Sequence, residues 1–269
     1  MVLVSCSMAV PFVWMLTASF KPRNETESTH LMPYDPQPSN YLVVLRHVPD
    51  PHMKRKLDLN FPRWYFNSLF IATFVTTLQV LTSAMAAYAF SRIRWPGRDK
   101  VFLLYLATMM IPGLVLMIPN YRVMMALAWV DSYAGLIIPA AFSAFGTFLL
   151  RQFMLTIPTS LDEAAEIDGA SKWQVFWDVI LPLARPGLIV LCIFTFLGTY
   201  KSFFWPLVML RSQSKYTLQV GLLFFDNSLT QETHLILAAA AMTIIPLIFL
   251  FVLLQKYLVK GIQLGAVKG

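Results

Sequence analysis

Long apolar runs constrain the fold of this chain more than any other feature of its sequence. About six of them approach the twenty or so residues that a helix needs to cross the hydrocarbon core of a bilayer. They cover residues 2–20, 65–90, 101–119, 132–153, 186–210 and 234–254. Hydrophobic residues make up 57% of the chain and charged residues only 13%, whereas a soluble domain carries about 25% charged residues. The sequence therefore predicts an all-α integral membrane protein with a single transmembrane domain over residues 1–269.

The first run, residues 2–20, allows two interpretations. It has no basic segment before its apolar residues, and "LTASF" at its end matches a signal-peptide cleavage site poorly. A first spanning helix is therefore favoured over a removable signal peptide. With six spans, both termini lie on the same side of the membrane.

The distribution of positive charge predicts which side that is. Four basic residues crowd the short link "SRIRWPGRDK" after the second run, and three more follow the sixth run: Arg92, Arg94, Arg98, Lys100, Lys256, Lys260 and Lys268. Basic residues favour the cytoplasmic side of short loops. The opposite loop, residues 21–63, also carries Lys and Arg, but they are spread over a longer segment and offset by acids. We therefore expect both termini in the cytoplasm and residues 21–63 outside.

An acidic segment lies between the fourth and fifth runs, in residues 158–186. It contains four carboxylates within seven residues: Asp162, Glu163, Glu166 and Asp168. Ser160 and Glu163 have the spacing of a capping box, and Ser171 and Gln174 repeat it. Gly169 lies between them, where the chain needs a positive φ or a close backbone contact. The segment is therefore predicted to form two short helices joined at a glycine.

The two predicted helices differ in what they present. Trp173, Phe176, Trp177 and Ile180 follow helical spacing, so we expect one apolar stripe that anchors the second helix. The first helix presents acids and small residues and has no base from Ser160 to Gly169. The negative surface of a membrane would repel such a segment. A protein partner with a basic groove is therefore favoured over a lipid surface.

The stretch "EAAEIDGASKWQVFWDVILPLARP" resembles the EAA loop in the permease subunits of ABC importers. The residues that carry the likeness are Glu163, Ala164, Ala165, Gly169, Leu181 and Pro182, with Val179 where isoleucine is usual. The segments "WMLTASFKP", "AYAFSRIRWPGRDK" and "QKYLVKGIQLGAVKG" are similar to the carbohydrate-importing subgroup that includes the second maltose permease subunit. The likeness extends over nearly the whole chain.

This resemblance implies a permease subunit of an ATP-driven importer of a sugar or oligosaccharide, in the bacterial cytoplasmic (inner) membrane. An extracytoplasmic solute-binding protein delivers the substrate in that family, and a homologous second permease subunit usually completes a heterodimer. The EAA loop is the family's coupling helix and enters a groove of a cytoplasmic ABC ATPase dimer, which binds ATP and Mg. The tail 261–269 is expected to reach toward the same dimer. The implied ATPase-coupling residues are Glu163, Ala164, Ala165, Asp168, Gly169 and Ser171, and the implied loop anchors are Trp173, Phe176, Trp177, Leu181 and Pro182.

No catalytic motif accompanies these features. The sequence has no GxxxxGK[ST] phosphate-binding loop, and His30, His47, His52 and His234 lack metal-ligand spacing. The net charge of +7 is modest, and no basic run alternates with aromatic residues as a nucleic-acid groove requires. We therefore expect no enzymatic activity, no metal or cofactor bound by this chain, and no nucleic-acid partner.

The candidate substrate path is the stretch "GTYKSFFWP" in the fifth run, where Pro206 is expected to interrupt the helix. Its candidate residues are Tyr200, Lys201, Phe204 and Trp205. Aromatic faces suit the C–H faces of sugar rings, and a lysine binds hydroxyls or a carboxylate. Related permeases often have Asn-Asp near this position, which points to a different or acidic sugar. The alternative is that Lys201 reaches the membrane interface beside interfacial aromatics, and both interpretations stay open.

Two other classes of protein compete with an ABC permease. A secondary transporter would show internal repeats and intramembrane carboxylates for its coupling ions, and no acid lies clearly within a run. A membrane scaffold protein could use the acidic segment to bind a cytoplasmic partner without transporting anything. Transport that requires ATP and a binding protein would separate all three classes.

Overall fold

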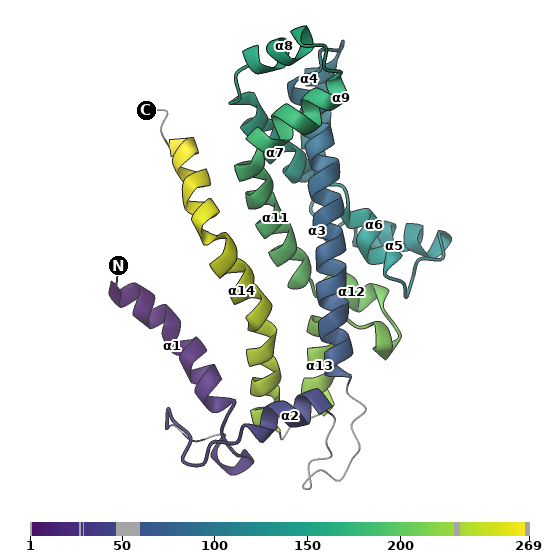
Figure 1. Cartoon of the computed structure of the whole chain (residues 1–269). Helices are drawn as coiled ribbons and strands as arrows, with labels where there is room; N and C mark the ends of the chain where they lie inside the picture. Colours follow the sequence, from purple (N-terminus) through teal and green to yellow (C-terminus); the bar gives the residue numbers. More distant parts are fainter. Residues whose placement is uncertain (1, 27, 29, 47–59, 229–231, 267–269) are drawn as a thin grey trace. The chain divides into compact units, whose positions relative to one another are not determined.

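The computed structural model describes residues 2–26, 28, 30–46, 60–228 and 232–266, and every regular element among them is a helix (Figure 1). This confirms the predicted all-α fold class. The chain divides into two compact units. The first comprises Met1–Ser68 with Leu210–Phe249, and the second comprises Leu69–Met209 with Leu250–Gly269. Helices α3 and α14 contribute to both units.

The first unit is held together where α3 begins. Its elements are α1 (Val2–Ala18), η1 (Arg23–Glu25), α2 (Ser39–Arg46), the start of α3 (Phe61–Ser91), η4 (Gln213–Lys215), α13 (Leu218–Ser228) and the start of α14 (Thr233–Ala266). The Asn67 side-chain amide donates to the carbonyls of Ser214 at 3.0 Å and Tyr216 at 2.9 Å. The Ser68 hydroxyl accepts a bond from the Leu218 amide at 2.7 Å. These buried bonds fix α3 to the turn before α13.

Lys21 departs from the sequence analysis, which counted it among the dilute charges of the outer loop. Its side chain is fully buried. Its ammonium donates to the Ser28 carbonyl at 3.1 Å, the Ser28 hydroxyl at 3.2 Å and the His30 carbonyl at 2.5 Å. The three acceptors compensate the loss of water around the buried charge. The basic residues of the outer loop at positions 54–56, and Lys268 of the tail, lie outside the described residues.

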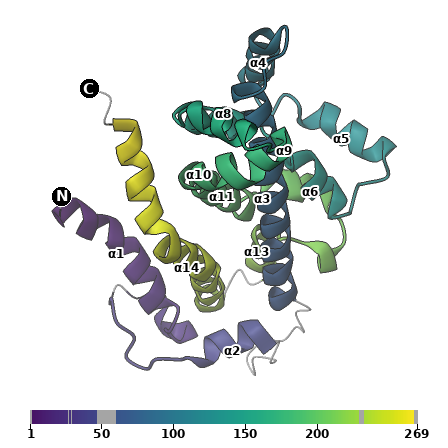
Figure 2. The same ribbon diagram turned by 45° about the horizontal axis from the view of Figure 1, so that its top comes forward.

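The second unit is built around the rest of α3. Its other elements are α4 (Arg98–Ala107), η2 (Thr108–Met110), α5 (Met117–Ala126), α6 (Ala134–Ala140), α7 (Ala144–Leu155), α8 (Ser160–Ile167), α9 (Lys172–Gln174), η3 (Val175–Ile180), α10 (Leu181–Leu183), α11 (Arg185–Tyr200) and α12 (Phe204–Met209). Within this unit, α3 lies between α5 and α6 on one side and α8 and α11 on the other (Figures 1 and 2). Helix α7 packs against both α4 and α11.

The described helices support fewer uninterrupted spans than the six predicted runs. By length and hydropathy, three described segments can cross a membrane: Phe61–Ser91, Ala134–Leu155 and Thr233–Leu253. A fourth is possible if the helices over Lys172–Leu183 and Arg185–Tyr200, which are bent by 76°, form one span. The first run gives a shorter apolar helix, over Ser7–Ala18. The structure thus supports several spans, and the count of six stays a prediction.

The prediction of one helix over residues 101–119 is wrong. The helical segment ends at Met110, and α5 begins only at Met117. Pro112 disfavours helical backbone at the residue before it, and Ile111 is accordingly extended, with φ −83° and ψ 117°. Hydropathy identified the apolar run correctly, but the proline divides it into two helices.

The fifth run is also divided, although not by Pro206 as expected. Helix α11 ends at Tyr200 and α12 begins at Phe204, so the break lies at residues 201–203. Pro206 falls in the first turn of α12. The amide hydrogens of a first turn have no partner within the helix, so a proline is tolerated there.

Candidate functional site

Helix α8 begins one residue earlier than the capping pattern predicted. Its N-cap is Thr159, which makes no side-chain capping bond, and Ser160 is already the first helical residue. The amides of Asp162 and Glu163 both donate to the Thr159 carbonyl, at 3.0 and 3.1 Å. The capping box predicted for Ser160 and Glu163 is therefore wrong, because Ser160 lies one residue after the N-cap position and is already inside the helix.

The junction of the two short helices matches the sequence analysis. Gly169 has φ +86°, and a Cβ atom at this position would meet nothing within 4 Å. The backbone amide of Ala170 donates to the carbonyl of Ala165 at 2.9 Å, and that of Gly169 donates to the backbone carbonyl of Glu166 at 3.1 Å. These two bonds form a Schellman motif. Glycine is therefore favoured here by the backbone conformation. It is not required by a close neighbouring atom.

The second capping box is confirmed. The Ser171 amide donates to the Gln174 side-chain oxygen at 2.8 Å, and the Gln174 amide donates to the Ser171 hydroxyl at 3.3 Å. These reciprocal bonds fix the start of α9 immediately after the turn at Gly169. The direction of α9 relative to α8 is thus set by a glycine and a serine.

The four residues of the predicted apolar stripe do not share one buried face. Phe176 and Ile180 are fully buried, whereas Trp173 is 59% and Trp177 39% exposed. Residues 175–180 form a π-helical segment, η3, so the α-helical period no longer applies to Phe176, Trp177 and Ile180. The Trp177 ring still lies beside that of Phe176, at 5.1 Å between centroids. The other two predicted anchors are less enclosed: Leu181 is half-buried and Pro182 exposed.

The end of helix α3 and the residue that follows it supply the anchors that the sequence analysis missed. The Arg92 guanidinium pairs with the Asp162 carboxylate at 3.1 Å, and the two side chains are only 5% and 15% exposed. The other amino group of Arg92 donates to the carbonyls of Met154 at 2.6 Å and Ile157 at 2.7 Å. This arginine therefore holds the end of α7 and the first turn of α8 together.

Tyr88, one turn earlier on α3, holds the second short helix. Its hydroxyl donates to the Lys172 carbonyl at 2.9 Å, and its ring lies 5.2 Å from that of Phe176. Tyr88 and Phe176 belong to a buried cluster with Leu150, Met154 and Ile180. The sequence marked Arg92 only as a positive charge and Asp162 only as a first-turn acid, because contacts this distant along the chain leave no local pattern.

Burial raises the pKa of the Asp162 carboxyl, and the charge of Arg92 lowers it in part. One oxygen of this carboxylate, Oδ1, is buried without a hydrogen-bond partner among the described residues. The charged form therefore depends on Arg92. Removing one member of a buried ion pair typically costs about 3–5 kcal/mol.

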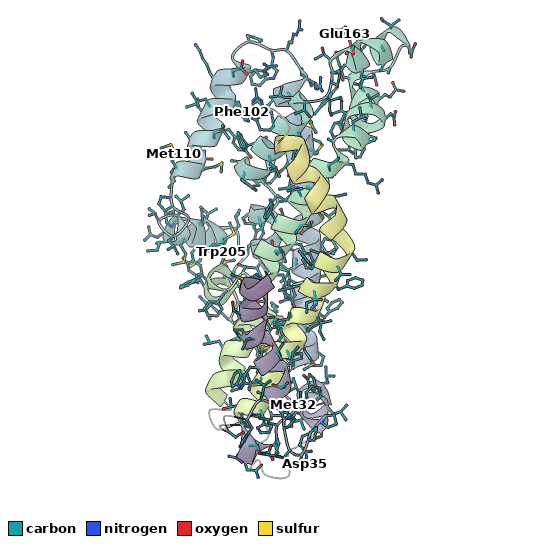
Figure 3. The ribbon with its side chains drawn as sticks, turned by 90° about the vertical axis from the view of Figure 1, so that its left-hand side faces the viewer. Met32, Asp35, Phe102, Met110, Glu163 and Trp205 are labelled. Carbon is teal, nitrogen blue, oxygen red and sulfur yellow. The ribbon has the colours of Figure 1, made fainter. Side chains whose placement is uncertain are left out.

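The opposite face of α8 carries no such contacts. Glu163, Ala164, Asp168 and Gly169 are exposed, and Ala165 is half-buried. Ile167 is 86% exposed. Ser171 is exposed at the start of the next helix, and Glu166 pairs with Lys172 along the surface. The segment thus presents carboxylates, small residues and one isoleucine, with Glu163 at the end of the second unit (Figure 3).

The candidate substrate-path residues do not form one surface. Tyr200 is only 1% exposed and its ring stacks on Phe196, with 5.9 Å between centroids. The Trp205 indole donates to the Gly135 carbonyl at 3.2 Å, and this side chain is half-buried. Only Lys201 and Phe204 are exposed. Trp205 and Glu163 lie at opposite ends of the second unit (Figure 3), so the two candidate sites are separate.

The chain matches a known protein family and several known proteins. Residues 79–264 match the family described as binding-protein-dependent transport system inner membrane component. The chain is 34% identical to the galactooligosaccharides transport system permease protein of Bacillus subtilis, over 96% of this chain and 90% of that protein. It is 32% identical to the trehalose/maltose transport system permease protein of Thermococcus litoralis, over 100% of this chain and 94% of that protein.

A solved structure shares the fold. It is a bacterial ABC transporter involved in the import of the acidic polysaccharide alginate, with a TM-score of 0.81 and 29% identity over 95% of this chain and 92% of that one. The family match covers most of the chain, including α8 and the helices that hold it. The chain therefore belongs to the inner-membrane components of binding-protein-dependent transport systems, and it is an ABC transporter permease subunit rather than an enzyme.

Proposed function

We propose that this chain forms part of the translocation path for a sugar or oligosaccharide delivered by an extracytoplasmic binding protein. Two of its relatives are named for galactooligosaccharides and for trehalose and maltose, and a third similar transporter imports alginate. In this proposal a homologous second permease subunit completes the path, and a cytoplasmic ABC ATPase dimer supplies ATP and Mg. Both chain termini then lie on the cytoplasmic side.

The observation that carries the proposal is that one side of α8 is held by buried contacts and the other side is exposed. Its inner side is fixed through Asp162 to Arg92, while its outer side presents Glu163, Ala164 and Ile167 to the surroundings. A helix held rigidly on one side transmits a displacement applied to the other. Carboxylates beside small residues suit a groove lined by Lys or Arg. We therefore assign α8 as the coupling helix.

Uptake by the complex in proteoliposomes tests this function. The assay supplies binding protein outside and ATP inside, with a labelled neutral maltooligosaccharide or a labelled acidic alginate oligosaccharide as probe. Uptake that needs both ATP and binding protein supports the proposal. Uptake driven by an ion gradient alone would instead identify a secondary transporter, and absence of uptake of a broad set of sugars would favour a scaffold. The two probes also decide between a neutral and an acidic substrate.

The purified chain alone should not hydrolyse ATP. It has no GxxxxGK[ST] sequence to hold the phosphates, so no residues are arranged for phosphoryl transfer of that type. Phosphate release by the isolated subunit should equal that of a heat-denatured sample. Hydrolysis well above that control, in a preparation free of ATPase subunit, would overturn this expectation.

Lys201 should face the translocation cavity in at least one transport state. In a background with Cys6 and Cys192 replaced by alanine, a Lys201→Cys thiol should react with a small water-soluble maleimide. Tyr200→Cys provides the matched control, because Tyr200 is buried and should stay unreactive. If Lys201→Cys reacts only with lipid-soluble reagents in every state, Lys201 instead reaches the membrane interface.

A further inference from the structure

The link between α3 and α4 lines an open pocket that contains none of the residues of the two candidate sites. Its volume is about 450 Å³, and its lining residues are Arg94, Trp95, Gly97, Arg98, Asp99 and Lys100. We call this the basic pocket. Trp95 is half-buried beside Phe90, with 5.9 Å between ring centroids, and it forms the apolar part of the lining.

The charge of the basic pocket is not balanced within the chain. Asp99 is the one acid in the lining, and its carboxylate is already held by Arg98 at 3.1 Å and by Arg151 at 3.5 Å. The side chains of Arg94 and Lys100 are exposed and form no ion pair or hydrogen bond with any part of the chain that the structure describes. The pocket thus offers two unpaired cations to an anion.

The backbone at the pocket adds to this preference. Gly97 has φ +82° and precedes the first turn of α4, which has no side-chain cap. The amide hydrogens of a helix's first turn point outward and carry partial positive charge. They suit a phosphate group.

The surroundings of the pocket indicate a lipid rather than a free ion. The pocket follows directly on the spanning helix Phe61–Ser91, so it lies where a bilayer ends. Beyond it, α4 exposes Val101, Leu103 and Leu104, which would contact acyl chains. Tryptophan and basic residues are both typical of the membrane interface. A free anion would gain nothing from the apolar side chains.

We propose that the basic pocket binds the phosphate group of an anionic phospholipid, with Arg94 and Lys100 as its cationic ligands. The Arg98 side chain and the backbone amides of Asp99 and Lys100 complete the headgroup site, and the exposed side chains of α4 hold the acyl chains. Each basic residue near an anionic membrane surface strengthens the binding of an anionic lipid. Loss of both ligands should therefore weaken binding by more than about tenfold.

Native mass spectrometry of the detergent-purified permease complex tests this site. The complex is delipidated, incubated with phosphatidylglycerol, and scored for the lipid retained. Wild type should retain at least one molecule that the Arg94→Gln/Lys100→Gln variant loses. Arg94→Gln alone should show an intermediate loss. Arg122→Gln is the matched control, because it removes an exposed arginine of α5 outside the pocket, and it should retain lipid as wild type does.

Three further arms separate the alternatives. Phosphatidylcholine with the same acyl chains should be retained less, and equal retention would overturn the role of charge. Displacement of the lipid by millimolar inorganic phosphate would show a free-anion site and overturn the proposal. If the double variant keeps its lipid but loses the ATPase subunit, the pocket is a protein contact instead. Equal retention of phosphatidylglycerol by wild type and by the double variant would also overturn the proposal.

Discussion

Replacing Gly169 with leucine will abolish most ATP-driven uptake while leaving the protein in the membrane at normal abundance. Gly169 adopts φ +86°, a conformation in which a side chain costs on the order of 1–2 kcal/mol. The packed helices of the whole protein can absorb that cost, but the small α8–α9 junction cannot without shifting. Because misplacement by about 1 Å can cost as much as a hundredfold in activity, uptake in proteoliposomes should fall by tenfold or more.

Two controls isolate the backbone effect. Gly169→Asn should retain most uptake, because asparagine tolerates a positive φ better than leucine does. Gly113→Leu adds the same bulk where the space is equally open and φ is not positive, and it should leave uptake unchanged. A Glu163→Lys variant should lose uptake differently, by failing to co-purify with the ATPase. Full uptake by Gly169→Leu, or its degradation, would remove this loop from the coupling mechanism.

The sequence predicted local features of the coupling segment well wherever their cause is local. The capping box of Ser171 and Gln174 needs only two side chains three residues apart, and Gly169 needs only its own backbone conformation. The first capping box failed because either of two adjacent residues, Thr159 or Ser160, could serve as the N-cap. Such a shift of one residue cannot be decided from side-chain types alone.

The interior of the apolar runs was harder to predict for a different reason. In a run that is apolar on every side, no polar face distinguishes a buried position from an exposed one. Tyr200 and Lys201 are neighbours in sequence, yet one is buried and the other exposed. The π-helical segment η3 likewise contains Trp177 and leaves it exposed, without any sign in the spacing of the aromatic residues.

The contacts that position α8 were missed because they join residues far apart in the chain. Helices α4, η2, α5, α6 and α7 all lie between Arg92 and Asp162 in the chain, and each of the two residues has an adequate local explanation of its own. A positive charge beside a span fits the cytoplasmic side, and an acid in a first turn fits the helix dipole. The structure adds that the two are buried together, which makes the pair a mechanical support and not a surface feature.

Replacing Arg92 with methionine should therefore disable the coupling segment more severely than any change on its exposed face. The variant loses the bond to Asp162 and the bonds to the carbonyls of Met154 and Ile157. It also leaves a buried carboxylate without its partner, at a cost of about 3–5 kcal/mol. We expect faster hydrogen exchange over residues 160–174, lower thermal stability and nearly complete loss of uptake.

The matched variant Asp162→Asn should be milder, because the amide oxygen still accepts a bond from Arg92 and the buried guanidinium keeps its bonds to the carbonyls of Met154 and Ile157. The double variant Arg92→Met/Asp162→Asn should be less destabilised than the sum of the two single changes, since removing the acid relieves the unpaired charge.

Acidification should also restore stability to the Arg92→Met variant. Burial raises the pKa of Asp162 and Arg92 opposes this, so without Arg92 the pKa rises further. A group whose pKa is higher in the folded state than in the unfolded state stabilises the fold as the pH falls through the folded pKa. The melting temperature of Arg92→Met should thus recover toward that of wild type at low pH. Additive losses in the double variant, together with a defect of Arg92→Met that does not depend on pH, would show that Arg92 acts without pairing to Asp162.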